Sequence, residues 1–175
     1  MNQKTAMKLF GLLGLLMLLS CGYADRHRNS SSCEQALVDS LEVRVQDSLF
    51  SNVHYSRSQL LEALTQTQDS LVYYRLLALY GKTFFVSSDF DSILYYNRRV
   101  KEFSRNASQS SESLQSPRWN DVLSDVYNIE GNVWMQLNRP DSAIIDYKKA
   151  YGYRLEGKKL HLLPDICINL SLIHI

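Results

Sequence analysis

Histidine and acidic residues are the side chains of this 175-residue chain best suited to catalysis or metal binding. The histidines are His27, His54, His161 and His174. They are scattered, and none has a second metal-binding side chain at helical spacing. No glycine-rich phosphate loop, His-Glu-x-x-His or Gly-x-Ser-x-Gly motif occurs. Asp121, Asp125 and Glu130 follow one predicted helix, which is typical of a solvated face. The sequence therefore predicts no enzyme, cofactor or metal site.

Cysteine is the other side chain with covalent chemistry, and the chain has three. Cys33 and Cys167 lie near opposite ends, and no Cys-x-x-Cys or zinc-type spacing occurs. A disulfide between these two is chemically allowed in an exported protein. Stacked helical hairpins would keep such distant segments apart, which disfavours the pairing.

Residues 1–20 have the pattern of a signal peptide. Lys4 and Lys8 form a basic start, and residues 9–19 are almost wholly apolar. That segment is too short for a bilayer, which needs about 20 apolar residues. Residues 18–21 read Leu-Leu-Ser-Cys and resemble the bacterial lipobox. The resemblance implies cleavage before Cys21 and a lipid on its sulfur. The alternatives are a secretory signal cleaved near Ala24 and a retained membrane anchor.

The lipobox resemblance implies a lipid-anchored bacterial protein, and we expect it in the cell envelope of a Gram-negative bacterium. Residues 21–32 are polar and serine-rich, which predicts a flexible tether. No acidic run of the kind that resembles surface-export signals follows Cys21. We therefore expect the protein to face the periplasm.

The charge and composition of the remaining 155 residues limit the possible partners and folds. Loss of Lys4 and Lys8 with the signal peptide leaves 17 basic residues against 18 acidic ones. Such a balance disfavours nucleic-acid binding, which needs clustered Lys and Arg. The chain has only seven glycines and three prolines, which favours helices over a turn-rich β fold.

Two stretches of the chain repeat each other. Gly81, Asp91 and Val100 recur as Gly131, Asp141 and Ala150, and the offset is 50 residues throughout. Self-similarity at a fixed period indicates stacked helical hairpins, which usually bind other proteins.

Apolar periodicity and breaker residues divide the chain into hairpins. We predict an N-terminal capping hairpin at 33–68, a hairpin at 69–104, a serine-rich loop at 105–117, a hairpin at 118–156, and the first helix of a third repeat at 157–169. The helices are expected at about 33–50, 55–67, 69–86, 90–104, 118–137 and 141–154, with a last one from Leu162. Asp69 is the expected N-cap of the third helix, and Pro164 suits a first helical turn.

The repeated residues resemble those of the tetratricopeptide repeat. The matching small, large and aromatic positions are Gly81, Phe84, Tyr127, Gly131, Trp134, Ala143, Tyr147 and Ala150. The resemblance implies an all-α, short right-handed solenoid in which Gly131 faces Ala143 and the aromatics pack around them. Ile93, Asn97 and Glu130 depart from the family pattern, and so does Leu155 where proline is usual. The family period is about 34 residues, and the serine-rich loop fits the excess.

In related repeats, ligands lie in a concave groove lined by the first helix of each hairpin. The resemblance places Arg75, Ala78, Lys82, Phe85, Val86, Asp125, Asn128, Asn132, Met135 and Gln136 there. Lys82 with Asn128 and Asn132 would hold an extended peptide by its backbone and termini. The alternative for each residue is a solvated helix face without a ligand. The expected partner is therefore a protein or peptide.

The pair Asp-Ser followed by a small or aliphatic residue occurs five times. Its serines are Ser40, Ser48, Ser70, Ser92 and Ser142. The pattern resembles the O-glycosylation signal that Bacteroidetes use on exported proteins. The alternative is helix capping, which suits Asp69, Asp91 and Asp141 but not Asp39 or Asp47, which lie inside a predicted helix.

Residues 170–175 back-translate to a sequence that resembles the end of a transposon-based sequencing adapter. We therefore expect native sequence to stop near Asn169, in a truncated third repeat. Two functions compete: a stand-alone lipoprotein scaffold, and the periplasmic sensory part of a longer histidine kinase or DNA-binding regulator. The lipobox favours the scaffold, because a lipid anchor makes a spanning helix redundant.

Overall fold

A computed structural model describes residues 35–47, 51–107 and 116–173. Within these ranges the secondary structure is helix and turn, without strands, which confirms the predicted all-α class. Residues 1–34 lie outside the described part, and with them the predicted signal peptide, the tether and Cys21. Among the described residues, no helix combines the length and apolar character needed to cross a membrane.

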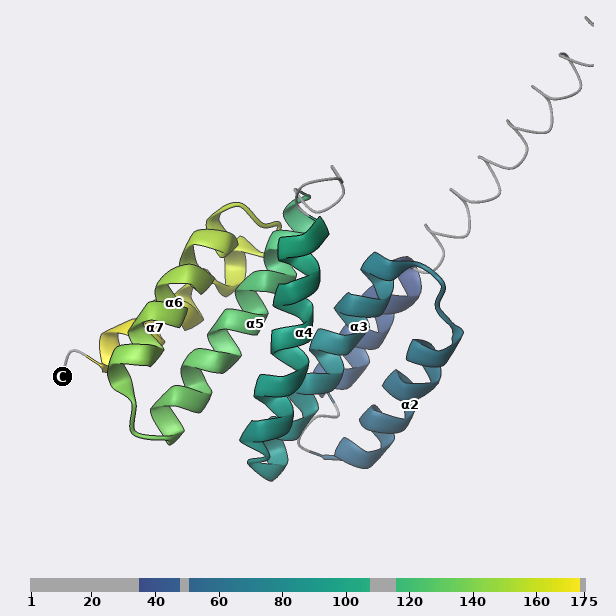
Figure 1. Ribbon diagram of the computed structural model, residues 1–175, viewed down its shortest axis with the longest axis horizontal. Helices are drawn as coiled ribbons and strands as arrows, with labels where there is room; N and C mark the ends of the chain where they lie inside the picture. Colours follow the sequence, from purple (N-terminus) through teal and green to yellow (C-terminus); the bar gives the residue numbers. More distant parts are fainter. Residues whose placement is uncertain (1–34, 48–50, 108–115, 174–175) are drawn as a thin grey trace, which may run out of the picture. The chain divides into compact units, whose positions relative to one another are not determined.

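The chain forms two compact units, residues 1–40 and 41–175. In the first unit, the described residues 35–40 are helical. In the second unit, the chain continues as helix to residue 47. The helices that follow are α2 (Val53–Gln66), α3 (Ser70–Lys82), the 3-10 helix η1 (Thr83–Ser87), α4 (Phe90–Ala107), α5 (Pro117–Gln136), α6 (Pro140–Leu155), the 3-10 helix η3 (Leu160–Leu162) and α7 (Leu163–Leu172). Helices that follow one another in the chain pack side by side, as in α3 with α4 and α5 with α6 (Figure 1).

Short polar side chains begin α3 and α5, and the sequence predicts the first of them, Asp69. The Asp69 carboxylate accepts from the backbone N–H of Leu71 and Val72, so Asp69 is the N-cap of α3. The Ser116 hydroxyl accepts from the N–H of Trp119 at the start of α5. Pro164 lies in the first turn of α7, where a missing N–H costs nothing.

The end of α3 differs from the prediction of an α-helix to Val86. The α-helix ends at Lys82, and residues 83–87 form a tighter 3-10 helix. Arg57 of α2 contacts this 3-10 segment. Its guanidinium donates to the backbone oxygen and hydroxyl of Thr83 and lies 4.1 Å from the centre of the Phe84 ring. The chain then turns at Ser88, whose φ of 53° is left-handed.

Two apolar clusters of the core lie among the described helices α3 to α7. The first lies among α3, α4 and α5 and contains Leu77, Val100, Trp119, Val122, Leu123 and Val126. The second lies between α6 and α7 and contains Ala143, Tyr147, Ala150 and Ile166, with Tyr127 and Trp134 of α5 packed against it. Tyr147 therefore belongs to the core and Trp134 packs against it, as the sequence predicts, whereas Phe84 is half-buried beside Tyr96 and lies in neither cluster.

The contact between α5 and α6 is very close at Gly131. A Cβ atom added there would lie 2.5 Å from Cδ1 of Tyr147. The sequence predicts Ala143 opposite Gly131, but the nearest atoms belong to the Tyr147 ring. The ring is nearly fully buried, and burial raises the pKa of Tyr147 to about 12. The phenol therefore stays protonated and donates to Oδ1 of Asn132 at 2.7 Å.

Polar contacts complete the α5–α6 pair on both sides of Gly131. The buried Ser124 hydroxyl donates to the backbone oxygen of Ala150 at 2.8 Å. The Trp134 indole N–H donates to Asp146 at 2.8 Å. These bonds fix the position of α6 along α5.

The contact at Gly131 predicts opposite effects for two glycine substitutions. Gly131→Ala forces a methyl group into the Tyr147 ring and should lower the free energy of unfolding by about 2 kcal/mol. Gly152→Ala is the control, because nothing lies within 4 Å of a Cβ at that position in α6. It should raise the free energy of unfolding by about 0.5–1 kcal/mol through higher helix propensity. Urea unfolding measures both, and a shift of the same sign in both variants would contradict the described contact.

Candidate functional site

Four of the predicted groove residues are engaged within the fold. Arg75 is 6% exposed, and its guanidinium lies 3.9 Å from the Glu42 carboxylate. Asp125 accepts from Arg154, which also donates to Asp121 at 2.8 Å. The structure therefore assigns Arg75 and Asp125 to ion pairs that hold helices together.

The two asparagines predicted to hold a peptide contact α7 instead. Nδ2 of Asn169 lies 3.1 Å from Oδ1 of Asn128 and 3.4 Å from Oδ1 of Asn132. Tyr147 uses the same Asn132 oxygen. The resemblance to the repeat family placed Asn128 and Asn132 on the correct helix, but it did not predict that α7 lies against them.

Of the other six predicted residues, Ala78 packs against the first apolar cluster, Val86 is exposed, and four more remain accessible. Lys82 and Phe85 are half-buried near the end of α3, and Met135 and Gln136 are exposed at the end of α5. The helices α3 and α5 pack against each other. The surface left for a partner is therefore smaller than predicted and lies towards the C-terminal ends of these helices. We call Lys82, Phe85, Met135 and Gln136 the helix-end surface.

A second surface is a groove that the sequence analysis missed. It has a volume of about 450 Å³ and is formed by α4, α5 and α6. Its lining residues are Leu94, Arg98, Lys101, Glu102, Arg105, Tyr127, Glu130, Trp134 and Lys149. We call these residues the α4–α6 groove. A signal was present, because 98, 101 and 105 share one helix face and 127, 130 and 134 share another.

A buried ion pair lies in this groove. Nζ of Lys101 lies 2.5 Å from Oε2 of Glu130, whose side chain is only 4% exposed. Burial raises the pKa of Glu130, and the hydrogen bond from Lys101 opposes that rise. The Lys101 side chain is 23% exposed, so it faces both the buried carboxylate and the groove.

Two lysines lie close to the Tyr127 ring. Nζ of Lys101 lies 5.2 Å and Nζ of Lys149 lies 5.0 Å from the ring centre, within the range of cation–π attraction. The Tyr127 ring also stacks with the Tyr153 ring, at 5.7 Å between ring centres and an interplanar angle of 5°. Burial, followed by the neighbouring Tyr153, raises the pKa of Tyr127. The groove therefore has a neutral aromatic floor with cations beside it.

Comparisons with protein-family models, curated proteins and solved structures found no match. The resemblance to the tetratricopeptide repeat therefore stays a prediction based on the residues quoted above.

The Asp-Ser pairs are only partly explained by capping. Asp69 caps α3 as expected, but the side chain at the start of α4 that accepts from Ser92 is Asp89, not Asp91. At the start of α6 the N-cap position is Arg139, which makes no side-chain capping bond, and Asp141 lies in the first turn. Capping thus accounts for one of the three pairs that it was expected to explain.

The serines of these pairs differ in accessibility. Ser40 and Ser70 are exposed, and Ser142 is half-buried. Ser92 is half-buried, and its hydroxyl donates to Asp89 at 2.7 Å. Ser48 lies outside the described residues. On exposure alone, Ser40 and Ser70 are the two best placed for modification.

The Lys101–Glu130 pair predicts a pH-dependent loss of stability. Lys101→Ala leaves the Glu130 carboxylate buried without its cation and should cost about 2 kcal/mol at pH 7. A raised pKa means that the cost of burying the charge is absent below the unfolded-state value and complete above the folded-state value. The difference from wild type should therefore shrink as the pH falls towards 4.

The control is the double variant Lys101→Ala with Glu130→Gln, in which no charge is buried. It should regain most of the lost stability at pH 7 and show little pH dependence relative to wild type. Unfolding by urea at several pH values measures all three proteins. A constant penalty for Lys101→Ala from pH 4 to pH 7 would show that the carboxylate is not the cause.

Proposed function

We propose that this chain is a protein-interaction module built from tetratricopeptide-like hairpins, carried on a lipid-anchored, exported bacterial protein. The observation that carries the proposal is the α5–α6 pair, in which Gly131 receives the Tyr147 ring and Trp134 packs against the same core. Those residues are the ones through which the sequence resembles the family. Because these residues pack the helices together, a partner would bind to the outer surfaces of the helices.

The helix-end surface is the part of the predicted groove best suited to a partner. It combines a cation, an aromatic ring, a thioether and an amide, which are Lys82, Phe85, Met135 and Gln136. Met135 is 37% exposed although it is apolar. A flexible apolar side chain beside polar groups is typical of a peptide-binding surface. The proposed role is that of a scaffold that holds a protein or peptide partner.

Site-specific crosslinking tests this role of the helix-end surface. A photoreactive amino acid in place of Met135 should form a discrete adduct with a partner in the native envelope. Leu61 of α2 is a matched control position, because it is also apolar and is 47% exposed. The adduct should be absent from the Leu61 position and should be lost when Lys82→Glu is added. The proposal would be contradicted by an equal yield of adduct from positions 61 and 135, or by an adduct whose yield does not change when Lys82→Glu is added.

The proposed anchor makes a separate prediction at Cys21. Expressed with its own N-terminus in a Gram-negative host, the chain should fractionate with membranes and gain the mass of the lipid. Cys21→Ser should release it into the soluble periplasmic fraction, because the sulfur that carries the lipid is gone. Cys167→Ser is the control, since this exposed thiol lies in α7. Membrane association that survives Cys21→Ser would argue for a retained hydrophobic anchor instead.

A further inference from the structure

We propose that the α4–α6 groove binds an acidic segment of a partner protein that carries an apolar side chain among its carboxylates. This surface is separate from the helix-end surface of α3 and α5. The inference rests on the charge, the aromatic floor and the volume of the groove, and it does not depend on the lipid anchor.

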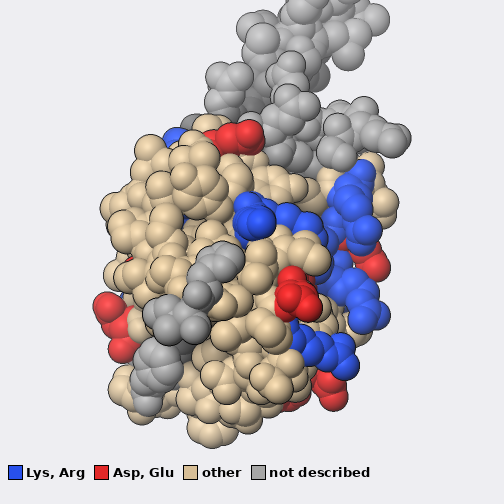
Figure 2. Space-filling model, turned by 90° about the vertical axis from the view of Figure 1, so that its left-hand side faces the viewer, with Lys and Arg blue, Asp and Glu red and all other residues tan. Residues whose placement is uncertain are grey.

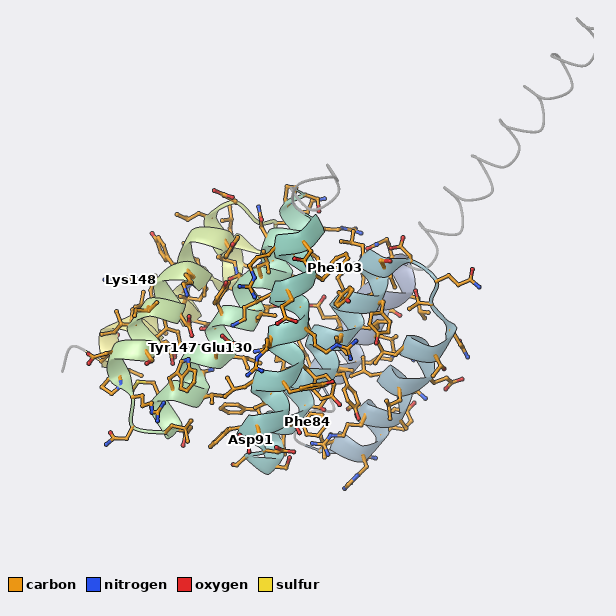
Figure 3. The ribbon with its side chains drawn as sticks, viewed as in Figure 1. Phe84, Asp91, Phe103, Glu130, Tyr147 and Lys148 are labelled. Carbon is orange, nitrogen blue, oxygen red and sulfur yellow. The ribbon has the colours of Figure 1, made fainter. Side chains whose placement is uncertain are left out.

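The groove has the size and position of a peptide site. Its volume of about 450 Å³ falls in the range of ligand sites, about 300–1,000 Å³. The helices α4, α5 and α6 lie in sequence across the view of Figure 1, and α5 contributes the floor between its neighbours. Figure 3 shows Glu130 on the part of α5 between α6 and α4, and Lys148 at the outer edge of α6.

The charge of the groove favours carboxylates. Four of its lining residues are basic and two are acidic. Arg98 and Lys101 are one turn apart on α4, and Lys149 comes from α6 on the other side. Figure 2 shows Lys and Arg, with Asp and Glu among them, towards the right edge of that view, the side that faces the reader in Figure 1, while its left part is largely uncharged. Basic clusters of this kind recognise acidic peptide motifs.

The floor of the groove favours an apolar anchor. Leu94, Tyr127 and Trp134 supply its apolar surface. The Trp134 indole N–H is already satisfied by Asp146, so the ring offers its apolar surface rather than a donor. An aliphatic or aromatic side chain of a peptide would bury this surface, and its flanking carboxylates would meet the cations of the rim.

The acids of the groove argue against a uniform polyanion such as a nucleic acid. Glu130 lies in the floor and Glu102 lies on α4 beside the cations. A continuous phosphate backbone would meet these carboxylates, and the whole chain has a net charge of only +1. A peptide can place an apolar side chain over Glu130 and its carboxylates elsewhere. The mixed lining therefore selects a peptide.

Fluorescence anisotropy with the full chain tests the groove. The probe is a labelled, end-capped peptide that alternates glutamate with leucine, and the control probe has lysine for glutamate. Lys149→Glu places an acid in the groove, whereas Lys148→Glu changes the net charge equally on the neighbouring residue, which does not line it. Arg98→Glu is a second groove variant at an exposed position, in case Lys149→Glu disturbs the contact with Asp146.

We expect Lys149→Glu and Arg98→Glu each to weaken binding of the acidic peptide about tenfold, and Lys148→Glu to leave it within about twofold. Binding should also weaken with salt. The proposal would be overturned if Lys148→Glu and Lys149→Glu weakened binding of the acidic peptide equally. It would also be overturned if the lysine peptide bound as tightly as the acidic peptide. Tighter, competing binding of an oligothymidine of the same length would overturn it as well, because it would make the ligand a general polyanion. Lys82→Glu should leave this binding unchanged, so failure here is separable from failure at the helix-end surface.

Discussion

The close approach of α5 and α6 at Gly131 is the contact on which the rest of the C-terminal part depends. The Tyr147 ring fits there only because residue 131 has no side chain. Once the ring is seated, its hydroxyl reaches Asn132 and Trp134 reaches Asp146. The ring belongs to the same apolar cluster as Ile166, so α7 packs on a surface to which the first contact contributes. The size of one residue thus sets the geometry of three helices.

The two polar departures from the repeat pattern have a common structural explanation. Asn97 stands where an aromatic residue is usual, and its side-chain amide donates to the backbone oxygen of Val126 at 3.2 Å. Glu130 stands where an apolar residue is usual, and it pairs with Lys101. Both contacts join α4 to α5, which is the junction between the two hairpins. Directional bonds at buried sites fix the register of this junction more narrowly than apolar packing alone.

Most of the helices could be predicted from the sequence, because local signals define them. Asp69 caps its own helix, and helical periodicity marks the apolar faces. The site was harder to predict, because its contacts join distant residues. The engagement of Asn128 by Asn169 spans 41 residues, and no local pattern encodes it. The groove likewise needs α4 and α6 to flank α5, and the residue facing Gly131 depends on how the helices cross. In the sequence, the spacing of the charged residues on α4 was a signal for the groove, but not for its position between α4 and α6.

The junctions on the two sides of α5 are built from different chemistry. Towards α4, the Lys101–Glu130 pair depends on an ionised carboxylate whose pKa burial raises. Towards α7, the Asn169 contacts with Asn128 and Asn132 are made by amides, which do not titrate and are not screened by salt. In an acidified compartment, protonation of Glu130 would relieve the cost of burying its charge, whereas the amide contacts would not change. Acidity therefore acts on the contact of α5 with α4 and leaves its amide contacts with α7 unchanged.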